Sequence, residues 1–137
     1  MAVLWFDLMF DVQAFGHRGG ELPEHVLASI GGYYGRVTTG AWPMNRLVAL
    51  AMGATLAALI AEIVDGKVAS WVAWTSLALA VVPIGRAATR IVPRAVRLGT
   101  RQDGAAVESR VARSILRDHV LCFVAIATVL VLQLAVA

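Results

Sequence analysis

The sequence contains few cysteines and few charged residues for its length, and each of these features excludes some kinds of protein. Cys122 is the only cysteine among 137 residues, so no intramolecular disulfide can form and cysteine usage does not indicate the compartment. Charged residues make up 15% of the chain, whereas a soluble domain carries about a quarter. Hydrophobic residues make up 59%, and the mean hydropathy is +0.74. These values exclude an ordinary soluble domain and indicate an integral membrane protein.

Motifs of known chemistry are also absent. The chain has no CxxC pair, no glycine-rich phosphate loop, no GxSxG elbow, no internal repeat and no low-complexity segment. Its histidines form no HxxxH, HExxH or ExxH pair, which argues against a metal or haem site. We therefore expect one domain over residues 1–137, with no cofactor, no metal and no nucleic-acid partner.

What the chain does have is three apolar runs of nearly membrane-spanning length, at 47–64, 68–85 and 119–137. A fourth apolar segment at 2–16 is shorter and contains Asp7 and Asp11. We predict that it also spans the membrane, and an amphipathic helix on the membrane surface is the alternative. It lacks the basic region and cleavage site of a signal peptide, so we expect it to be retained. The predicted fold is an all-α integral membrane four-helix bundle.

The basic residues predict how the bundle is oriented. Eleven of the twelve Lys and Arg residues lie in the connection between the first two spans or in the connection before the last span, and only Lys67 lies in the remaining turn. Connections rich in Lys and Arg stay in the cytoplasm. We therefore expect both termini to face outward, in what is best explained as a bacterial inner membrane.

Five arginines continue the third apolar run at intervals of three or four residues: Arg86, Arg90, Arg94, Arg97 and Arg101. On one helix they would form a stripe within an arc of about 80°. The simplest interpretation is that the stripe binds lipid headgroups. The alternative is that it forms one wall of a site for an anionic ligand or a partner protein. Pro93 should kink or break this helix, because its ring would clash with the carbonyl of Thr89.

Two further helices are expected beside the spans. The segment 103–118 is amphipathic and follows a turn at Asp103-Gly104, so it should form an Arg-rich cytoplasmic helix that continues into the last span. The segment 22–39 also has helical spacing, although Gly31 and Gly32 weaken it unless another backbone packs closely there. Tyr34, with Arg36 and Arg46, is typical of a membrane–water interface.

Ionisable residues inside a membrane are costly, so they are the best functional candidates. Asp7 and Asp11 share one helix face and should point into the bundle. Arg113, Arg117 and His119 lie at the cytoplasmic entry to the last span, at the level expected for Asp11. A buried carboxylate needs a partner to remain ionised, and the simplest partner for Asp11 would be one of these basic residues. The same contact could orient His119 as a base that moves a proton at neutral pH.

The layout resembles the anthrone oxygenase-like family of small four-helix membrane proteins. The resemblance rests on the loop phrase YYGRVTTGAWPMNRLV before the second span and on the phrase ARSILRDH before the last span. It implies oxidation of a polycyclic phenolic anthrone to a quinone by O₂ without a cofactor. The matching positions are Asn45, Arg113, Arg117 and His119.

Three functions follow as hypotheses. An oxygenase-like enzyme would use His119 as base and Arg113 or Arg117 to hold the phenolate, beside an apolar cavity for a lipophilic small molecule. Its further ligand-binding candidates are Asp7, Asp11, Asn45 and Tyr33. A non-catalytic accessory or lipid-binding subunit needs none of these. A proton- or ion-coupled transporter would rest on the two aspartates and would require a homo-oligomer, since no inverted repeat is visible.

Overall fold

The computed structural model describes residues 1–17, 19–40 and 42–136, and these residues are helical or in turns, with no strand. Arg18, one of the basic residues of the first connection, and Ala137, the predicted end of the last span, lie outside the described residues. The predicted all-α class is confirmed.

The first half of the chain folds into two short helical segments and one long helix. These are α1 (Ala2–Asp11) with a 3-10 turn η1 (Val12–Ala14), then α2 (Glu24–Gly35) with a π-helical turn η2 (Arg36–Gly40), and α3 (Trp42–Asp65). The second half is α4 (Ser70–Arg86), a π-helical turn η3 (Ala87–Ile91), α5 (Val92–Thr100) and α6 (Ala105–Val136). The expected helix over 22–39 and the expected continuation of the segment 103–118 into the last span are both present.

Three stretches of the described chain are long and apolar enough to cross a membrane: Asn45–Asp65, Ser70–Thr100 and Ala105–Val136. Each overlaps one of the three apolar runs from which spans were predicted, with bounds that differ by a few residues or more. The predicted N-terminal span at 2–16 is not among them. Helix α1 has ten residues, which is about 15 Å, half of a hydrocarbon core about 30 Å thick. The 3-10 turn η1 adds three residues to this helical segment, which is still shorter than a spanning helix, so the predicted fourth span is not confirmed.

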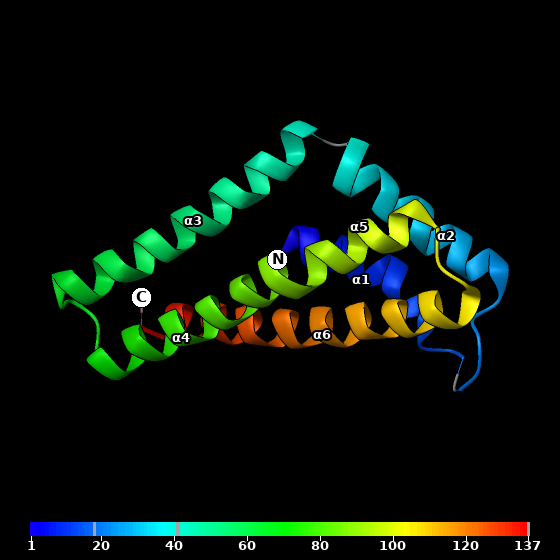
Figure 1. Cartoon of the computed structure of the whole chain (residues 1–137). Coiled ribbons are helices and arrows are strands. Elements are labelled where there is room, and N and C mark those ends of the chain that lie inside the picture. Colours follow the sequence, from blue (N-terminus) through cyan, green and yellow to red (C-terminus); the bar gives the residue numbers. More distant parts are fainter. Residues whose placement is uncertain (18, 41, 137) are drawn as a thin grey trace.

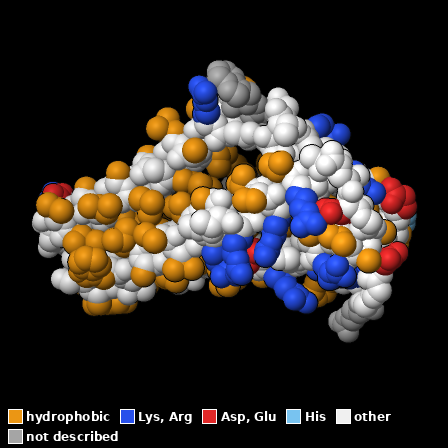
Figure 2. All heavy atoms as spheres, in the orientation of Figure 1, with side chains coloured by type: hydrophobic (Ala, Val, Ile, Leu, Met, Phe, Trp, Pro, Cys, Tyr) orange, Lys and Arg blue, Asp and Glu red, His pale blue; other side chains and the backbone are white. Residues whose placement is uncertain are grey.

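The long helices diverge at one end and pack together at the other. Helices α4 and α6 run side by side in opposite directions, while α3 leans away from them (Figure 1). Only 6% of the apolar window of α3 is buried within the protein. Lys and Arg side chains gather over α5 and the first half of α6, and hydrophobic side chains cover α3, α4 and the rest of α6 (Figure 2). The molecule therefore has an apolar end and a charged end.

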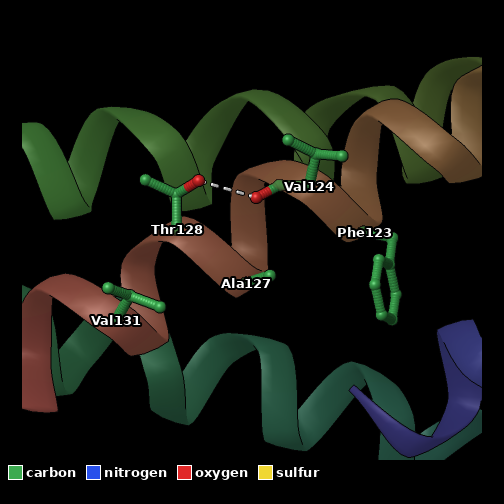
Figure 3. Close-up of a pocket in the computed structure, with 5 residues that line it drawn as sticks. All are labelled: Phe123, Val124, Ala127, Thr128 and Val131. Atoms are coloured by element: carbon green, nitrogen blue, oxygen red, sulfur yellow. Dashed lines mark hydrogen bonds between the residues drawn. The ribbon is translucent and has the colours of Figure 1, made fainter.

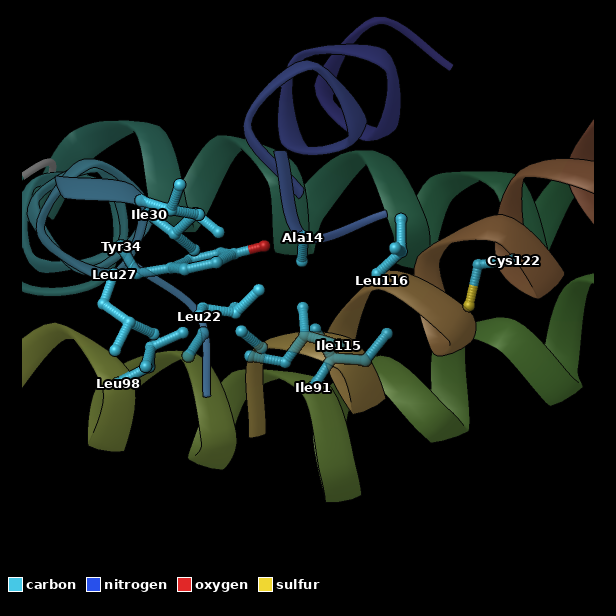
Figure 4. Packing of buried hydrophobic residues seen from close by; sticks show 13 residues of the cluster. Ala14, Leu22, Leu27, Ile30, Tyr34, Ile91, Leu98, Ile115, Leu116 and Cys122 are labelled. Carbon is cyan, nitrogen blue, oxygen red and sulfur yellow. The ribbon is translucent and has the colours of Figure 1, made fainter. Parts of the chain in front are cut away.

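The main hydrophobic core lies at the charged end. Helix α2 packs its buried face against α5 and the first half of α6, with Leu27 and Ile30 fully buried against residues that include Leu98 and Ile115 (Figure 4). Ala14 and Leu22, before α2, close the same core. This core is what fixes α1 and α2 against the start of the last span.

Helix α5 continues α4 through Pro93 without a break. The irregularity instead lies at η3, just before the proline, where the backbone widens into a π turn over Ala87–Ile91. A π turn shifts the hydrogen-bonding pattern by one residue, which accommodates a proline that lacks an N–H donor. The predicted disturbance of the helix is therefore present, one turn earlier than Pro93.

Glycines allow α2 and α5 to cross closely. A Cβ on Gly99 would lie 2.8 Å from the backbone nitrogen of Gly35, and a Cβ on Gly31 would lie 3.0 Å from the carbonyl oxygen of Leu98. Gly32 has nothing within 4 Å of the equivalent position. The close approach of α5 thus explains why a glycine occupies position 31, in agreement with the condition stated from the sequence. No such close approach explains Gly32.

Candidate functional site

A cluster of five polar side chains joins α1, α2 and α6. Tyr33 donates a hydrogen bond to Asp7 (2.7 Å), and Tyr34 donates one to Asp11 (2.8 Å). The second carboxylate oxygen of Asp11 lies 2.6 Å from Nδ1 of His119. The expected contact between Asp11 and a basic residue at the entry to the last span is therefore formed, and it is made by the histidine.

The hydrogen bond to Asp11 defines the orientation of the imidazole. An ionised carboxylate can only accept, so Nδ1 of His119 carries the proton and donates it to Asp11. The other ring nitrogen, Nε2, lies 3.8 Å from the carboxylate of Asp7, which is too long for a hydrogen bond. In the neutral ring, Nε2 is consequently the nitrogen that can accept a proton. The carboxylate of Asp7 lies close enough to stabilise the positive charge of the ring after protonation.

Burial keeps the two tyrosines in their neutral form. The pKa of Tyr34 is raised far above its ordinary value, first by burial and then by the negative charge of Asp11. The pKa of Tyr33 is raised by burial and by its hydrogen bond to Asp7. Both hydroxyls therefore remain protonated at physiological pH and act as hydrogen-bond donors to the carboxylates.

Helical spacing and packing bring these groups together. Asp7 and Asp11 are four residues apart on α1 and face inward, with the side chain of Asp11 fully buried. The ring of Phe10 stacks on Tyr33 with centroids 4.0 Å apart. Tyr34 belongs to the hydrophobic core through its ring, and its hydroxyl points toward the end of α1 (Figure 4). The prediction that both aspartates face the bundle is confirmed.

An apolar pocket of about 290 Å³ begins one helical turn beyond His119. It is lined by α6 residues: Phe123, Val124, Ala127, Thr128 and Val131 (Figure 3). The only side-chain hydroxyl among them, that of Thr128, donates to the carbonyl of Val124. Phe123 also meets Trp5 of α1, with ring centroids 6.1 Å apart. The pocket is open and offers hydrophobic contacts rather than polar ones.

The structure does not bring the other predicted site residues to His119. Arg113 donates to the backbone carbonyls of His17 and Gly20, so it ties down the loop before α2. Arg117 is exposed and lines a second hollow, between α4 and α6, which adjoins the pocket. Asn45 donates to the carbonyl of Thr38 and thus connects η2 to α3.

Most of the arginine stripe is occupied by ion pairs within the protein. Arg86 and Arg94 both bind Asp118 of α6, and Arg97 binds Asp103. At the end of α5, Arg101 adopts a left-handed backbone (φ 51°) and pairs with Glu24 and Glu108. Arg90 is exposed, with no ion pair to another described residue. The stripe therefore packs α5 against α6 and α2, and headgroup binding by it stays a prediction.

Two groups were not found from the sequence. Tyr34 was expected at the membrane interface but is buried at the centre of the cluster, because α2 packs inside the core rather than along the membrane surface. The signal was its helical spacing, seven residues after Leu27 and four after Ile30. A second polar group joins the three candidate spans: Gln133 of α6 donates to Glu62 of α3 (2.9 Å) and to Ser76 of α4 (3.2 Å).

Among the described residues, no group of three or more His, Cys, Asp or Glu side chains is placed to hold a metal ion. No protein-family model, curated protein or solved structure matches the chain. The resemblance to anthrone oxygenase-like proteins therefore stays a prediction, and the functional argument rests on the site.

Proposed function

We propose that this protein is a membrane-embedded enzyme that removes a proton from a lipophilic, weakly acidic aromatic substrate, in the manner of an anthrone oxygenase. The observation that carries the proposal is the environment of His119. Its Nδ1 is held by Asp11, its Nε2 makes no hydrogen bond to a described residue, and an apolar pocket begins one turn away. A carboxylate-oriented imidazole is a common general base.

The chemistry requires one base and no cofactor. Nε2 of His119 accepts a proton from the CH₂ carbon between the two rings of an anthrone-like substrate, and the electron pair of the C–H bond remains in an enolate. O₂ then oxidises this carbon. Over the whole reaction the carbon loses two hydrogens and gains one oxygen atom, while the second oxygen atom leaves as water. Asp11 and Asp7 stabilise the imidazolium formed in the first step.

The enolate is best stabilised by that imidazolium. Arg113 and Arg117 were the sequence-based candidates for this role. Arg113, however, is bound to backbone carbonyls, and Arg117 lies two residues before His119, about 160° around α6 from it. The two tyrosine hydroxyls already donate to aspartates. The proton taken by His119 creates the positive charge nearest to the reacting carbon, so base and electrostatic partner are the same ring.

A non-catalytic accessory or lipid-binding subunit is the second candidate. It is favoured by the completeness of the cluster, because both tyrosine hydroxyls and both ring-facing carboxylates already have partners within the protein, and His119 is buried. A buried charge pair whose only role is to hold α1 against α6 would make the same contacts as a catalytic one. Activity and stability measurements on one set of variants separate these two functions.

The test uses the purified full-length protein in liposomes with a phenolic anthrone as substrate, following O₂ consumption and quinone absorbance. His119→Gln should lower turnover by about a hundredfold or more if the ring is a general base. His25→Gln is the matched control, because His25 is exposed on α2, and it should leave turnover unchanged. Asp11→Asn should also lower turnover, because it removes the negative charge that stabilises the imidazolium.

Two results would contradict the enzyme proposal. One is a parent protein that consumes no O₂ with any anthrone. The other is a His119→Gln variant as active as the parent. If the parent shows no activity and the His119→Gln variant melts at a much lower temperature than the parent, the accessory function is supported instead.

The proposed orientation in the membrane follows the basic residues. We infer a bacterial inner membrane with the connections at 18–46 and 86–117 in the cytoplasm and the turn at Gly66 outside. Helix α6 then carries the C-terminus outward. We place the short helix α1 alongside α6, which it contacts, within the cytoplasmic half of the membrane. In this proposal the N-terminal segment does not reach the outer face.

A further inference from the structure

A second hollow, separate from the His119 cluster, lies between α4 and α6. It measures about 610 Å³ and is lined by apolar side chains that include Ala78 and Val82 from α4 and Leu121 from α6. One charged residue, Arg117, also lines it. The hollow adjoins the smaller pocket at Val124 and Thr128, which line both. It is an open groove along two antiparallel spans.

The length of the groove matches one leaflet of a bilayer. Its lining on α6 extends from Arg117 to Thr128, which is eleven residues or about 16 Å of helix. Half of a hydrocarbon core is about 15 Å. The groove thus runs from the charged end of the molecule to roughly the middle of the membrane, which is the length that one acyl chain of an inner-leaflet lipid requires.

The charge at the cytoplasmic end selects the headgroup. Arg86 lies four residues after Val82 on α4, but its guanidinium is bound to Asp118. Arg117 has no carboxylate within ion-pair distance among the residues that the structure describes, and it is exposed. Its guanidinium is therefore available to a phosphate at the depth where the apolar lining ends.

We infer that the groove between α4 and α6 is a binding site for an anionic phospholipid of the inner leaflet, with the acyl chain along Val82 and Leu121 and the phosphate on Arg117. The site differs from the arginine stripe, most of which is used in ion pairs within the protein. It does not depend on the proposed enzymatic activity.

The test is a titration of the purified full-length protein with phosphatidylglycerol and with phosphatidylcholine of the same acyl chains, with bound lipid counted by native mass spectrometry. The parent should bind phosphatidylglycerol more tightly. Arg117→Gln should reduce that preference by about fivefold, the effect of one cation near a lipid headgroup. Arg110→Gln is the matched control, since Arg110 lies on the same side of α6 two turns beyond the groove, and it should change the preference less than twofold.

A second variant tests the acyl-chain part of the site. Ala78 is exposed in the groove, so Ala78→Phe should fill it and weaken binding of both lipids to a similar degree. Unchanged reactivity of the buried thiol of Cys122 would show that each variant is folded. The inference is overturned if Arg117→Gln keeps the full preference, if Arg110→Gln removes as much of it, or if Ala78→Phe binds both lipids like the parent.

Discussion

Gly99→Ala should destabilise the protein at the crossing of α2 and α5. The added Cβ would lie 2.8 Å from the backbone nitrogen and 2.9 Å from the Cα of Gly35. Ordinary contacts of this kind begin at 3.4 Å, so the two backbones would have to separate by at least about 0.6 Å, the difference between these distances. Backbone atoms within helices cannot rotate aside as a flexible side chain would.

The magnitude follows from two opposing terms. Overpacking of this kind costs about 1–3 kcal/mol. Alanine has a higher helix propensity than glycine by up to about 1 kcal/mol, and this gain is smaller at Gly99 because it lies next to the end of α5. The net loss of stability should be about 1–2 kcal/mol. Movement of Gly35 would also displace the neighbouring Tyr34 from Asp11, so the crossing and the polar cluster are coupled.

Two other glycines of α2 are matched controls. A Cβ at Gly35 would lie 3.3 Å from the carbonyl oxygen of Gly99, which is only slightly tight, and a Cβ at Gly32 would meet nothing within 4 Å. Gly35→Ala should therefore have a small effect. Gly32→Ala should stabilise the protein by about 0.5–1 kcal/mol, because only the helix-propensity term remains.

The assay is thermal unfolding followed by a fluorogenic thiol reagent. Cys122 is the only cysteine and is buried, so the reagent reports unfolding without any engineered site. Gly99→Ala should lower the melting temperature by roughly 3–10 °C, and Gly32→Ala should raise it. If Gly99→Ala melts at or above the parent temperature, or if the two variants shift equally, α2 and α5 do not cross as closely as the structure shows.

Two further predictions concern the orientation in the membrane and an exposed ion pair. A cysteine at Thr100 should be protected from a membrane-impermeant thiol reagent in intact cells, whereas one at Gly66 should react, and equal reactivity would refute the proposed orientation. The hydrogen bond from Arg97 lowers the pKa of Asp103 below its ordinary value. A lowered folded-state pKa stabilises the fold above the unfolded pKa, and the stabilisation is lost as pH falls through the folded value. Arg97→Gln should return the Asp103 pKa toward 3.8 in an NMR titration. The stability deficit of the variant should disappear only once the pH falls below the lowered folded-state pKa of the parent; an unshifted pKa would show that the pair does not form in solution.

Hydropathy alone was sufficient for the long helices. A run of about 20 apolar residues has no stable alternative to a helix in a membrane, because every backbone polar group must be bonded within the segment. The described parts of the runs at 47–64, 68–85 and 119–137 accordingly fall almost entirely within α3, α4 and α6. The turn at Asp103-Gly104 and the continuation of the cytoplasmic helix into the last span were predicted for a similar reason, since both are set by local composition.

The N-terminal segment shows where composition becomes insufficient. Residues 2–16 are apolar enough to enter a membrane, but hydropathy does not reveal where the helix ends. The structure ends α1 at Asp11, where the backbone continues into the 3-10 turn η1 and the carboxylate is bound to Tyr34 and His119. These contacts come from α2 and α6, which lie far away in the sequence, so composition does not reveal them.

What the sequence by itself determined is the class of the protein, its helical elements and the polar residues that needed a partner, since these follow from the cost of placing backbone and charged groups in an apolar medium. The choice of partners was decided only by the tertiary structure. Asp11 and His119 are 108 residues apart, and several basic residues were equally eligible for the aspartate. Tyr34 of α2 and His119 of α6 both bond to Asp11, so the packing of α2 and α6 beside α1 selects the partner.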